Sequence, residues 1–267
     1  MKYKLIAMDL DGTLNNDQKS IDPPTLNALF AAQEKGIRLA LASARPLPGL
    51  YKERDALRLK EHRGILMAYN GGAIVDAATG EMLYSCAMQT DQAKRVLRDL
   101  EKLPVTPILD DGVQFYVTDK NGYKVDYECK NNRMTCTEVK NLSDFCSFAP
   151  CKILMSVDPS VIKEIQRTIA GLLPSDLTVV QTAAFYLEVI PVSVNKGVGL
   201  ANTCKAIGID RSETIAFGDS ENDIPMLEAA GMGVAMENAD QEVKAAANMV
   251  TLSNNDNGIA RALEKLL

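Results

Sequence analysis

The chain has 267 residues, 46% of them hydrophobic, and carries a formal net charge of −6. A chain of this length can bury a substantial core in one large or two ordinary domains, and its negative charge argues against nucleic acid or an anionic membrane surface as the main partner. A small anionic ligand stays compatible with it, because one metal ion and one lysine can set the local field.

Six cysteines and a single histidine, His62, limit the metal and redox chemistry. No two cysteines are spaced as CxxC, so a zinc site is not expected. The N-terminus does not resemble a secretory signal, because lysines and aspartates interrupt its apolar residues. No apolar run approaches membrane-spanning length. We expect free thiols, a soluble cytoplasmic protein, and no catalytic role for His62, which lies in a charged stretch.

The first expected element is a buried strand over residues 3–8, an apolar run that ends in Asp9 and Asp11. Positions i and i+2 of an extended segment point to the same side, so both acids can face one site. Gly12 follows, where the chain has to turn. Two carboxylates on one side raise each other's pKa unless a cation lies between them. Such oxygen ligands suit a hard cation such as Mg²⁺.

Strand and helix signals alternate up to residue 72. A helix is predicted after Asp22-Pro23-Pro24, which supplies an N-cap and a first-turn proline, and another is predicted to follow Pro46 and to run through Leu59. Strands are predicted at residues 37–42 and 64–69. These units favour a parallel sheet with right-handed crossovers. The polar residues expected at its ligand-binding edge, beyond the carboxyl ends of the strands, are Asp9, Asp11, Ser43 and Asn70.

The region from about residue 83 to residue 187 follows a different pattern. Turn signals at Asp111-Gly112 and Asn121-Gly122 separate short strands, and helices are predicted over residues 91–102 and 160–173. We interpret this region, 83–187, as an inserted α+β domain. It contains all but one of the cysteines, which are expected to act as small core residues. The α/β core is then expected to comprise residues 1–82 and 188–267.

The α/β pattern returns at Asn195-Lys196-Gly197, which opens a predicted helix. A strand over residues 213–217 then ends in a second acidic cluster, residues 218–223. If the two clusters converge, Asp9, Asp219 and a carbonyl can bind one cation, and Asp223 can reach that cation or a bound water. An aspartate nucleophile, an aspartate acid and base, a hydroxyl, a lysine and a cation suffice for phosphoryl transfer through an aspartyl-phosphate.

Four elements of the chain resemble, in order, the four motifs of the haloacid dehalogenase-like (HAD) superfamily. They are residues 9–13 (DLDGT), Ser43, Lys196 and residues 218–223 with the pattern GDxxND. The chain looks like the Cof-type phosphatases of that superfamily, which insert a type-two cap between the second and third motifs. The resemblance spans nearly the whole chain and implies a Rossmann-like parallel-sheet core (the HAD fold) with an α+β cap. The cap would close over the site and choose the substrate.

Two departures from the family pattern stand at the second and third motifs. The family often has Thr-Gly-Arg where this chain has Ser43-Ala44-Arg45, and Ser-Lys where it has Asn195-Lys196. Ala44 lacks the conformational freedom of glycine, so the local turn is expected to differ. Arg45 taken alone is expected to pair with an acid.

The resemblance also implies roles for single residues. Asp9 would be the nucleophile, Asp11 the acid and then the base, and Thr13 would orient Asp9. The phosphoryl oxygens would be held by Leu10 N–H, Ser43 with Ala44 N–H, Lys196 and Asn222. The metal set would be Asp9, Asp11 through its backbone carbonyl, Asp219 and Asp223, the last supporting the ligands around the ion.

The expected function is Mg²⁺-dependent hydrolysis of a small phosphorylated metabolite, a sugar phosphate or a phosphorylated cofactor, through an aspartyl-phosphate. A phosphotransferase or sugar-phosphate mutase would use the same intermediate and hand it to a hydroxyl. A non-catalytic sensor of phosphorylated ligands is disfavoured, because Asp9 and Asp11 are both present. The sequence specifies neither the physiological substrate nor the oligomeric state.

Overall fold

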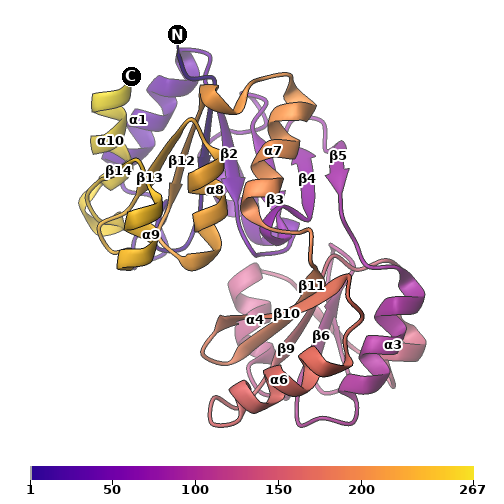
Figure 1. Cartoon of the computed structure of the whole chain (residues 1–267). Helices are drawn as coiled ribbons and strands as arrows, with labels where there is room; N and C mark the ends of the chain where they lie inside the picture. The colour runs from indigo at the N-terminus through magenta and orange to yellow at the C-terminus, as the bar shows by residue number, and fades with distance from the viewer. Residues whose placement is uncertain (1) are drawn as a thin grey trace. The chain divides into compact units, whose positions relative to one another are not determined.

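A computed structural model describes residues 2–267, and within them the chain forms two compact units (Figure 1). The first unit combines the chain up to Ser85 with the part from Asn195 onward, and the second spans Cys86–Val194. Both boundaries lie further along the chain than the expected residues 83 and 187. The reason is strand pairing, since Met82–Ser85 belongs to the sheet of the first unit and Tyr186–Pro191 to that of the second.

The first unit is built on an eight-stranded sheet in the order β14-β13-β12-β1-β2-β3-β4-β5. Pairing is parallel from β14 to β3 and antiparallel at β4 and β5. This confirms the predicted parallel-sheet core, with a hairpin at one edge. Its strands are β1 (Leu5–Met8), β2 (Arg38–Ala42), β3 (Ile65–Ala68), β4 (Ala73–Asp76), β5 (Met82–Ser85), β12 (Thr214–Gly218), β13 (Met232–Ala235) and β14 (Met249–Val250).

Helices cover both faces of this sheet, which is why β1 is buried along its whole length and apolar on both sides. Leu5 and Ala7 face a cluster that includes side chains of α7, α8 and α9. In Figure 1, α1 and α10 lie side by side behind the sheet, and they contact each other. The helices are α1 (Pro23–Glu34), α2 (Tyr51–Ala56), α7 (Lys196–Ile207), α8 (Ile224–Ala229), α9 (Gln241–Ala246) and α10 (Gly258–Leu266).

Two of these helices differ from the sequence prediction. The helix expected through Leu59 ends at Ala56, because Arg58 adopts a left-handed backbone with φ of 51°. A 3₁₀ turn over Leu47–Leu50 replaces its first part. Helix α9 was not predicted. It has six residues, of which Val243 is the buried one, so its hydrophobic periodicity is too short to recognise.

The second unit contains a six-stranded sheet in the order β10-β11-β9-β6-β7-β8. One face packs on α3 and α6 through a cluster that includes Leu97, Ile165, Ile153 and Leu187. This is the expected α+β arrangement. The elements are α3 (Thr90–Leu100), β6 (Thr106–Asp110), β7 (Phe115–Val117), α4 (Val125–Asn132), β8 (Cys136–Glu138), α5 (Leu142–Phe145), β9 (Ile153–Ser156), α6 (Ile162–Leu172), β10 (Leu177–Ala183) and β11 (Tyr186–Pro191).

A helix, α4, follows the turn at Asn121-Gly122, where the sequence predicted a further short strand. Lys124 enters it with φ of 58° and Arg133 leaves it with φ of 54°. Both ends depend on left-handed backbone at lysine and arginine, residues that give no local signal for it. The six cysteines are free thiols, as expected. Within residues 2–267, no helix has the length and apolar character needed to cross a membrane.

Candidate active site

Polar residues meet at one edge of the first unit's sheet because β12, β1, β2 and β3 run parallel there. Asp9 directly follows β1, Ser43 follows β2, and Asp219 follows β12. Asn70 lies in a 3₁₀ turn directly after β3, and Lys196 is the first residue of α7. The structure thus gathers at this edge the strand-end residues that the sequence analysis selected.

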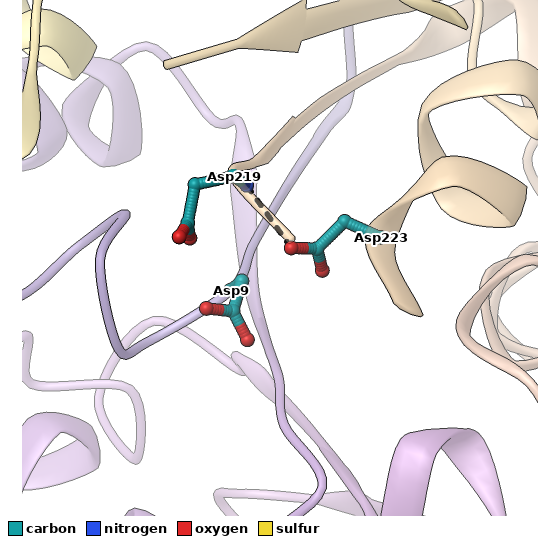
Figure 2. Close-up of side chains that lie close together, drawn as sticks. All are labelled: Asp9, Asp219 and Asp223. Carbon is teal, nitrogen blue, oxygen red and sulfur yellow. Dashed lines mark hydrogen bonds between the residues drawn. The ribbon is translucent and has the colours of Figure 1, made fainter. Parts of the chain in front are cut away.

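Three carboxylates converge at the centre of this edge. One oxygen each from Asp9, Asp219 and Asp223 lies within 4.8 Å of the other two, and Figure 2 shows the three side chains around a common space. Asp9 is 7% exposed and Asp223 is fully buried. Like charges this close and this buried repel one another strongly unless positive charge lies among them.

Lys196 supplies part of that positive charge. Its Nζ lies 2.5 Å from Asp9 Oδ1 and 2.6 Å from Asp223 Oδ1, and its side chain is fully buried. Asn195 caps the helix by accepting a hydrogen bond from Val198 N–H, which fixes the start of α7. Although burial works in the other direction, Asp223 and Asp9 raise the pKa of Lys196 above its ordinary value. Lys196 therefore stays an ammonium ion.

One lysine does not balance the three acids. Burial raises the pKa of Asp9 to about 8, Lys196 opposes this shift, and Asp223 and Asp219 add to it. Burial likewise raises the pKa of Asp219. A second cation between Asp9 and Asp219 would favour the ionised form of both groups. Two carboxylates with a backbone carbonyl are a donor set that fits Mg²⁺, which keeps several of its waters.

Thr13 holds Asp219. Its hydroxyl donates to Asp219 Oδ1 at 2.6 Å, and Ser220 Oγ donates to Oδ2 at 3.1 Å. The expected partner of Thr13 was Asp9, and that expectation was wrong. Gly12, with φ of +85°, turns the loop so that it passes beneath Asp219. A Cβ on Gly12 would lie 2.3 Å from Asp219 Oδ2, so this close approach requires glycine.

Asp223 uses both of its oxygens on protein donors. Oδ2 accepts the backbone N–H groups of Asp219 and Ser220, each at 3.0 Å, and Oδ1 accepts from Lys196. The dashed line in Figure 2 marks the bond from Asp219 N–H. Asp223 therefore fixes the loop that presents Asp219 and, at the same time, the position of Lys196.

Asp11 points to a different set of partners from Asp9. Its carboxylate accepts from Arg45 Nε at 2.9 Å and Nη2 at 2.8 Å, and from Lys19 Nζ at 2.7 Å. Although burial works in the other direction, Arg45 and Lys19 hold the pKa of Asp11 below its ordinary value. The expectation that Arg45 pairs with an acid is confirmed, and the acid is Asp11.

The second motif forms a tight turn without glycine. Ser43 N–H donates to Met67 O at 2.9 Å, and Ser43 Oγ accepts from Arg45 N–H at 3.2 Å. Ala44 is not among the described residues with positive φ, so an alanine fits this turn without strain. The turn beside it brings Asn70 and Asn222 together, with Asn222 Nδ2 donating to Asn70 Oδ1 at 3.1 Å.

Leu10 links the first motif to the loop that follows it. Its side chain is fully buried, and its carbonyl accepts Asn15 N–H at 2.8 Å. This fixes the peptide between the two acids of the first motif.

Two residues at the site were given no role by the sequence analysis. Lys19 reaches Asp11 from a loop eight residues later. Asn238 Nδ2 donates to Gly12 O at 2.8 Å across 226 residues, and its Oδ1 accepts from Asn254 N–H. The contact of Lys19 depends on a loop conformation, and that of Asn238 joins segments far apart in the chain, so spacing alone could not have selected them.

The sequence model of the haloacid dehalogenase-like hydrolases matches residues 6–263 of this chain. The chain belongs to this family. It is 30% identical over 293 residues to the phosphatase YwpJ of Bacillus subtilis, covering 99% of this chain and 100% of the relative. It is also 30% identical over 273 residues to the 5-amino-6-(5-phospho-D-ribitylamino)uracil phosphatase YbjI of Escherichia coli, covering 100% and 97%.

A solved structure gives the same assignment. The crystal structure of a haloacid dehalogenase-like hydrolase from Bacteroides thetaiotaomicron superimposes with a TM-score of 0.94 at 32% identity, covering 99% of this chain and 100% of that one. The predicted fold, a parallel-sheet HAD core with an inserted α+β unit, is confirmed. The chain is a hydrolase of this family, related to phosphatases that act on phosphomonoesters.

Proposed function

We propose that this hydrolase releases inorganic phosphate from small phosphomonoesters through an aspartyl-phosphate formed on Asp9. The observation that carries the proposal is the setting of the Asp9 carboxylate. It is almost fully buried, is held by Lys196 at 2.5 Å, and stands beside the carboxylate of Asp219. A carboxylate fixed in this way can attack phosphorus, while the lysine offsets the charge on the phosphoryl oxygens.

Mg²⁺ is the proposed metal. Asp9, Asp219 and the backbone carbonyl of Asp11 would hold it, and the bound ion would neutralise phosphoryl charge. Asp223 would support this set by orienting the backbone at Asp219 and by fixing Lys196, since both its oxygens already accept hydrogen bonds.

The remaining motif residues would hold the phosphoryl group. The N–H of Leu10, the hydroxyl of Ser43 and the N–H of Ala44 would donate to its oxygens, together with Lys196 and Asn222. These groups come from the ends of β1 and β2, from the start of α7, and from the 3₁₀ turn Glu221–Asp223 that precedes α8.

The proposed reaction has two steps. Asp11 first takes a proton from solvent, since the structure pairs its carboxylate with Arg45 and Lys19. Asp9 attacks phosphorus, the bond between phosphorus and the ester oxygen breaks, and Asp11 gives that proton to the departing alcohol. A water then attacks the aspartyl-phosphate, Asp11 takes a proton from that water, and inorganic phosphate leaves. In this step the bond between the Asp9 oxygen and phosphorus breaks, which restores the Asp9 carboxylate. Asp11 then releases its proton to solvent, so protons and bonds balance over the cycle.

Sugar phosphates and phosphorylated cofactor precursors are the proposed substrate class. The relative from Escherichia coli is named for a phosphorylated ribitylaminouracil, which combines a polyol phosphate with a heterocycle. We propose that the second unit, Cys86–Val194, acts as the cap that selects among such compounds. The protein is expected to act in the cytoplasm.

A phosphate-release assay across sugar, polyol and nucleoside monophosphates, with Mg²⁺ and with chelator, tests this proposal. The expected result is Mg²⁺-dependent release of free phosphate in the absence of any acceptor. Release that requires an added hydroxyl compound, with the phosphoryl group recovered on that compound, would identify a transferase instead. Binding of phosphorylated compounds without turnover would identify a sensor.

A further inference from the structure

Two cationic side chains, Arg45 and Lys19, contact the carboxylate of Asp11, and a third, Lys52, contacts the backbone of Lys19. Arg45 contacts both of its oxygens, Lys19 donates to Oδ1 at 2.7 Å, and Lys52 Nζ donates to the carbonyl of Lys19. The only other carboxylate that the described ion pairs place at this cluster is Glu53, 3.6 Å from Lys52. Positive charge is thus concentrated beside the acid and base of the proposed reaction.

This cluster is held in place by the fold. Arg45 has a side chain only 13% exposed, and its Nη1 donates to Gly49 O. The loop that carries Lys19 closes on Asn16, whose buried side-chain oxygen accepts from Gln18 N–H and from Ser20. Lys19 itself has φ of 58°, a conformation that a lysine adopts at a cost.

The proposed role of Asp11 conflicts with its contacts. Both carboxylate oxygens are occupied by Arg45 and Lys19. To reach the ester oxygen of a substrate, the carboxylate has to give up these charge-assisted hydrogen bonds. Arg45, which is largely buried, would then lose its anion, and leaving a buried cation unpaired is unfavourable. The exchange becomes favourable when another anion takes the place of Asp11.

We propose that Lys19, Arg45 and Lys52 form a subsite for a second anionic group of the substrate, a carboxylate or a second phosphate. Asp11 occupies this subsite when no substrate is bound, and the substrate anion releases it to act on the leaving oxygen. The inference rests on the proposed function and narrows it to phosphomonoesters that carry another negative charge on the leaving group. Arg45 and the two lysines are positioning and specificity residues in this account.

Matched pairs of substrates test the subsite. 6-Phosphogluconate and sorbitol 6-phosphate differ at one carbon, a carboxylate against an alcohol, and 3-phosphoglycerate and glycerol 3-phosphate differ in the same way at shorter range. Fructose 1,6-bisphosphate against fructose 6-phosphate tests a phosphate as the second anion. We expect the anionic member of at least one pair to have a kcat/KM about tenfold higher. The pair that shows the preference identifies the source of the anion.

The variants Lys19→Met and Lys52→Met should each reduce this preference several-fold, mainly by raising KM for the anionic member. The matched control is Lys35→Met, an exposed lysine at the end of α1. It should leave the preference unchanged. Circular dichroism would verify that all three variants fold.

Two outcomes overturn the subsite. One is equal or lower kcat/KM for every anionic member, with the neutral members hydrolysed. The other is a preference that Lys19→Met and Lys52→Met leave intact. Both outcomes keep the phosphatase proposal, because phosphate is still released. Absence of phosphate release from every compound would instead contradict the proposed function, and the subsite with it.

Discussion

Lys196 Nζ and Asp9 Oδ1 are 2.5 Å apart, although 187 residues separate them in the chain. The contact joins the first residue of α7 to the residue that follows β1, and Asp223 completes it from a third segment. Three pieces of sequence are thus fixed around one buried ammonium group. Both the catalytic proposal and the stability of this edge of the sheet depend on it.

Replacing Lys196 should harm both stability and activity. Lys196→Met leaves Asp9 and Asp223 buried without their cation, and we expect a loss of about 3–5 kcal/mol in the free energy of unfolding without metal. Phosphate release should fall by at least about 100-fold. Urea unfolding and the phosphate assay measure the two effects. Lys205→Met, an exposed lysine on the same helix, is the control and should change neither.

Thr13 should control metal affinity through Asp219. Thr13→Val removes the hydroxyl that donates to Asp219 Oδ1 at 2.6 Å. We expect Mg²⁺ binding to weaken by about 10- to 100-fold, measured by titration calorimetry. Thr13→Ser keeps the hydroxyl and should bind Mg²⁺ nearly as the wild type does. Unchanged affinity in Thr13→Val would show that Asp219 is not a ligand or needs no such support.

The second unit contains a buried ion pair that the reaction does not use. Lys152 Nζ and Glu188 Oε1 are 2.7 Å apart, and each side chain is 4% exposed. Lys152→Met should lower the free energy of unfolding by about 3–5 kcal/mol, because it leaves the Glu188 carboxylate buried without its cation. The double variant Lys152→Met with Glu188→Leu should recover most of that loss. Equal losses in the single and double variants, by chemical denaturation, would contradict this reading.

Glu128 makes stability depend on pH. Burial raises the pKa of its carboxyl above the ordinary value of 4.5, while Lys152 opposes the shift and Glu188 adds to it. At pH values between the unfolded and the folded pKa, the folded protein therefore holds a proton that the unfolded chain has lost. The stability that Glu128 contributes is fully present at pH values below the pKa of this carboxyl in the unfolded chain. It is lost as pH rises through the pKa of the same carboxyl in the folded protein.

Comparison with Glu128→Gln isolates this effect, because glutamine does not titrate. Asn132 Nδ2 can still donate to it, as it does to Glu128 Oε1 at 2.8 Å. The free energy of unfolding of wild type relative to the variant should fall as pH rises from about 4 to about 7. A difference that stays constant or grows over that range would mean that the carboxyl is not buried as described.

The sequence was informative where short spacing determines geometry. Asp9 and Asp219 follow apolar strands, and parallel pairing of β1 with β12 necessarily brings those strand ends together. The partner of Thr13 could not be read in this way, because it depends on how Gly12 turns the loop beneath Asp219. The role of Lys19 could not be predicted from the sequence either, because its contact with Asp11 depends on the conformation of the loop that carries it.

The secondary structure, too, was predicted where a local sequence pattern determines it and missed where backbone conformation or strand pairing determines it. Apolar or periodic segments such as β1 and α6 were predicted, because burial imposes their pattern. Helix α4 was missed because it is entered and left through Lys124 and Arg133 in left-handed conformations. The boundaries of the second unit were misplaced because pairing, not composition, assigns β5 and β11 to their sheets.

The central claim is that Asp9 is the nucleophile of a Mg²⁺-dependent phosphatase. The most direct test is phosphate release from the best substrate of the panel by wild type and Asp9→Asn, each with Mg²⁺ and with chelator. We predict release by the wild type that chelator abolishes, and no metal-dependent release by Asp9→Asn at equal folded concentration. Full metal-dependent turnover in Asp9→Asn would contradict the account.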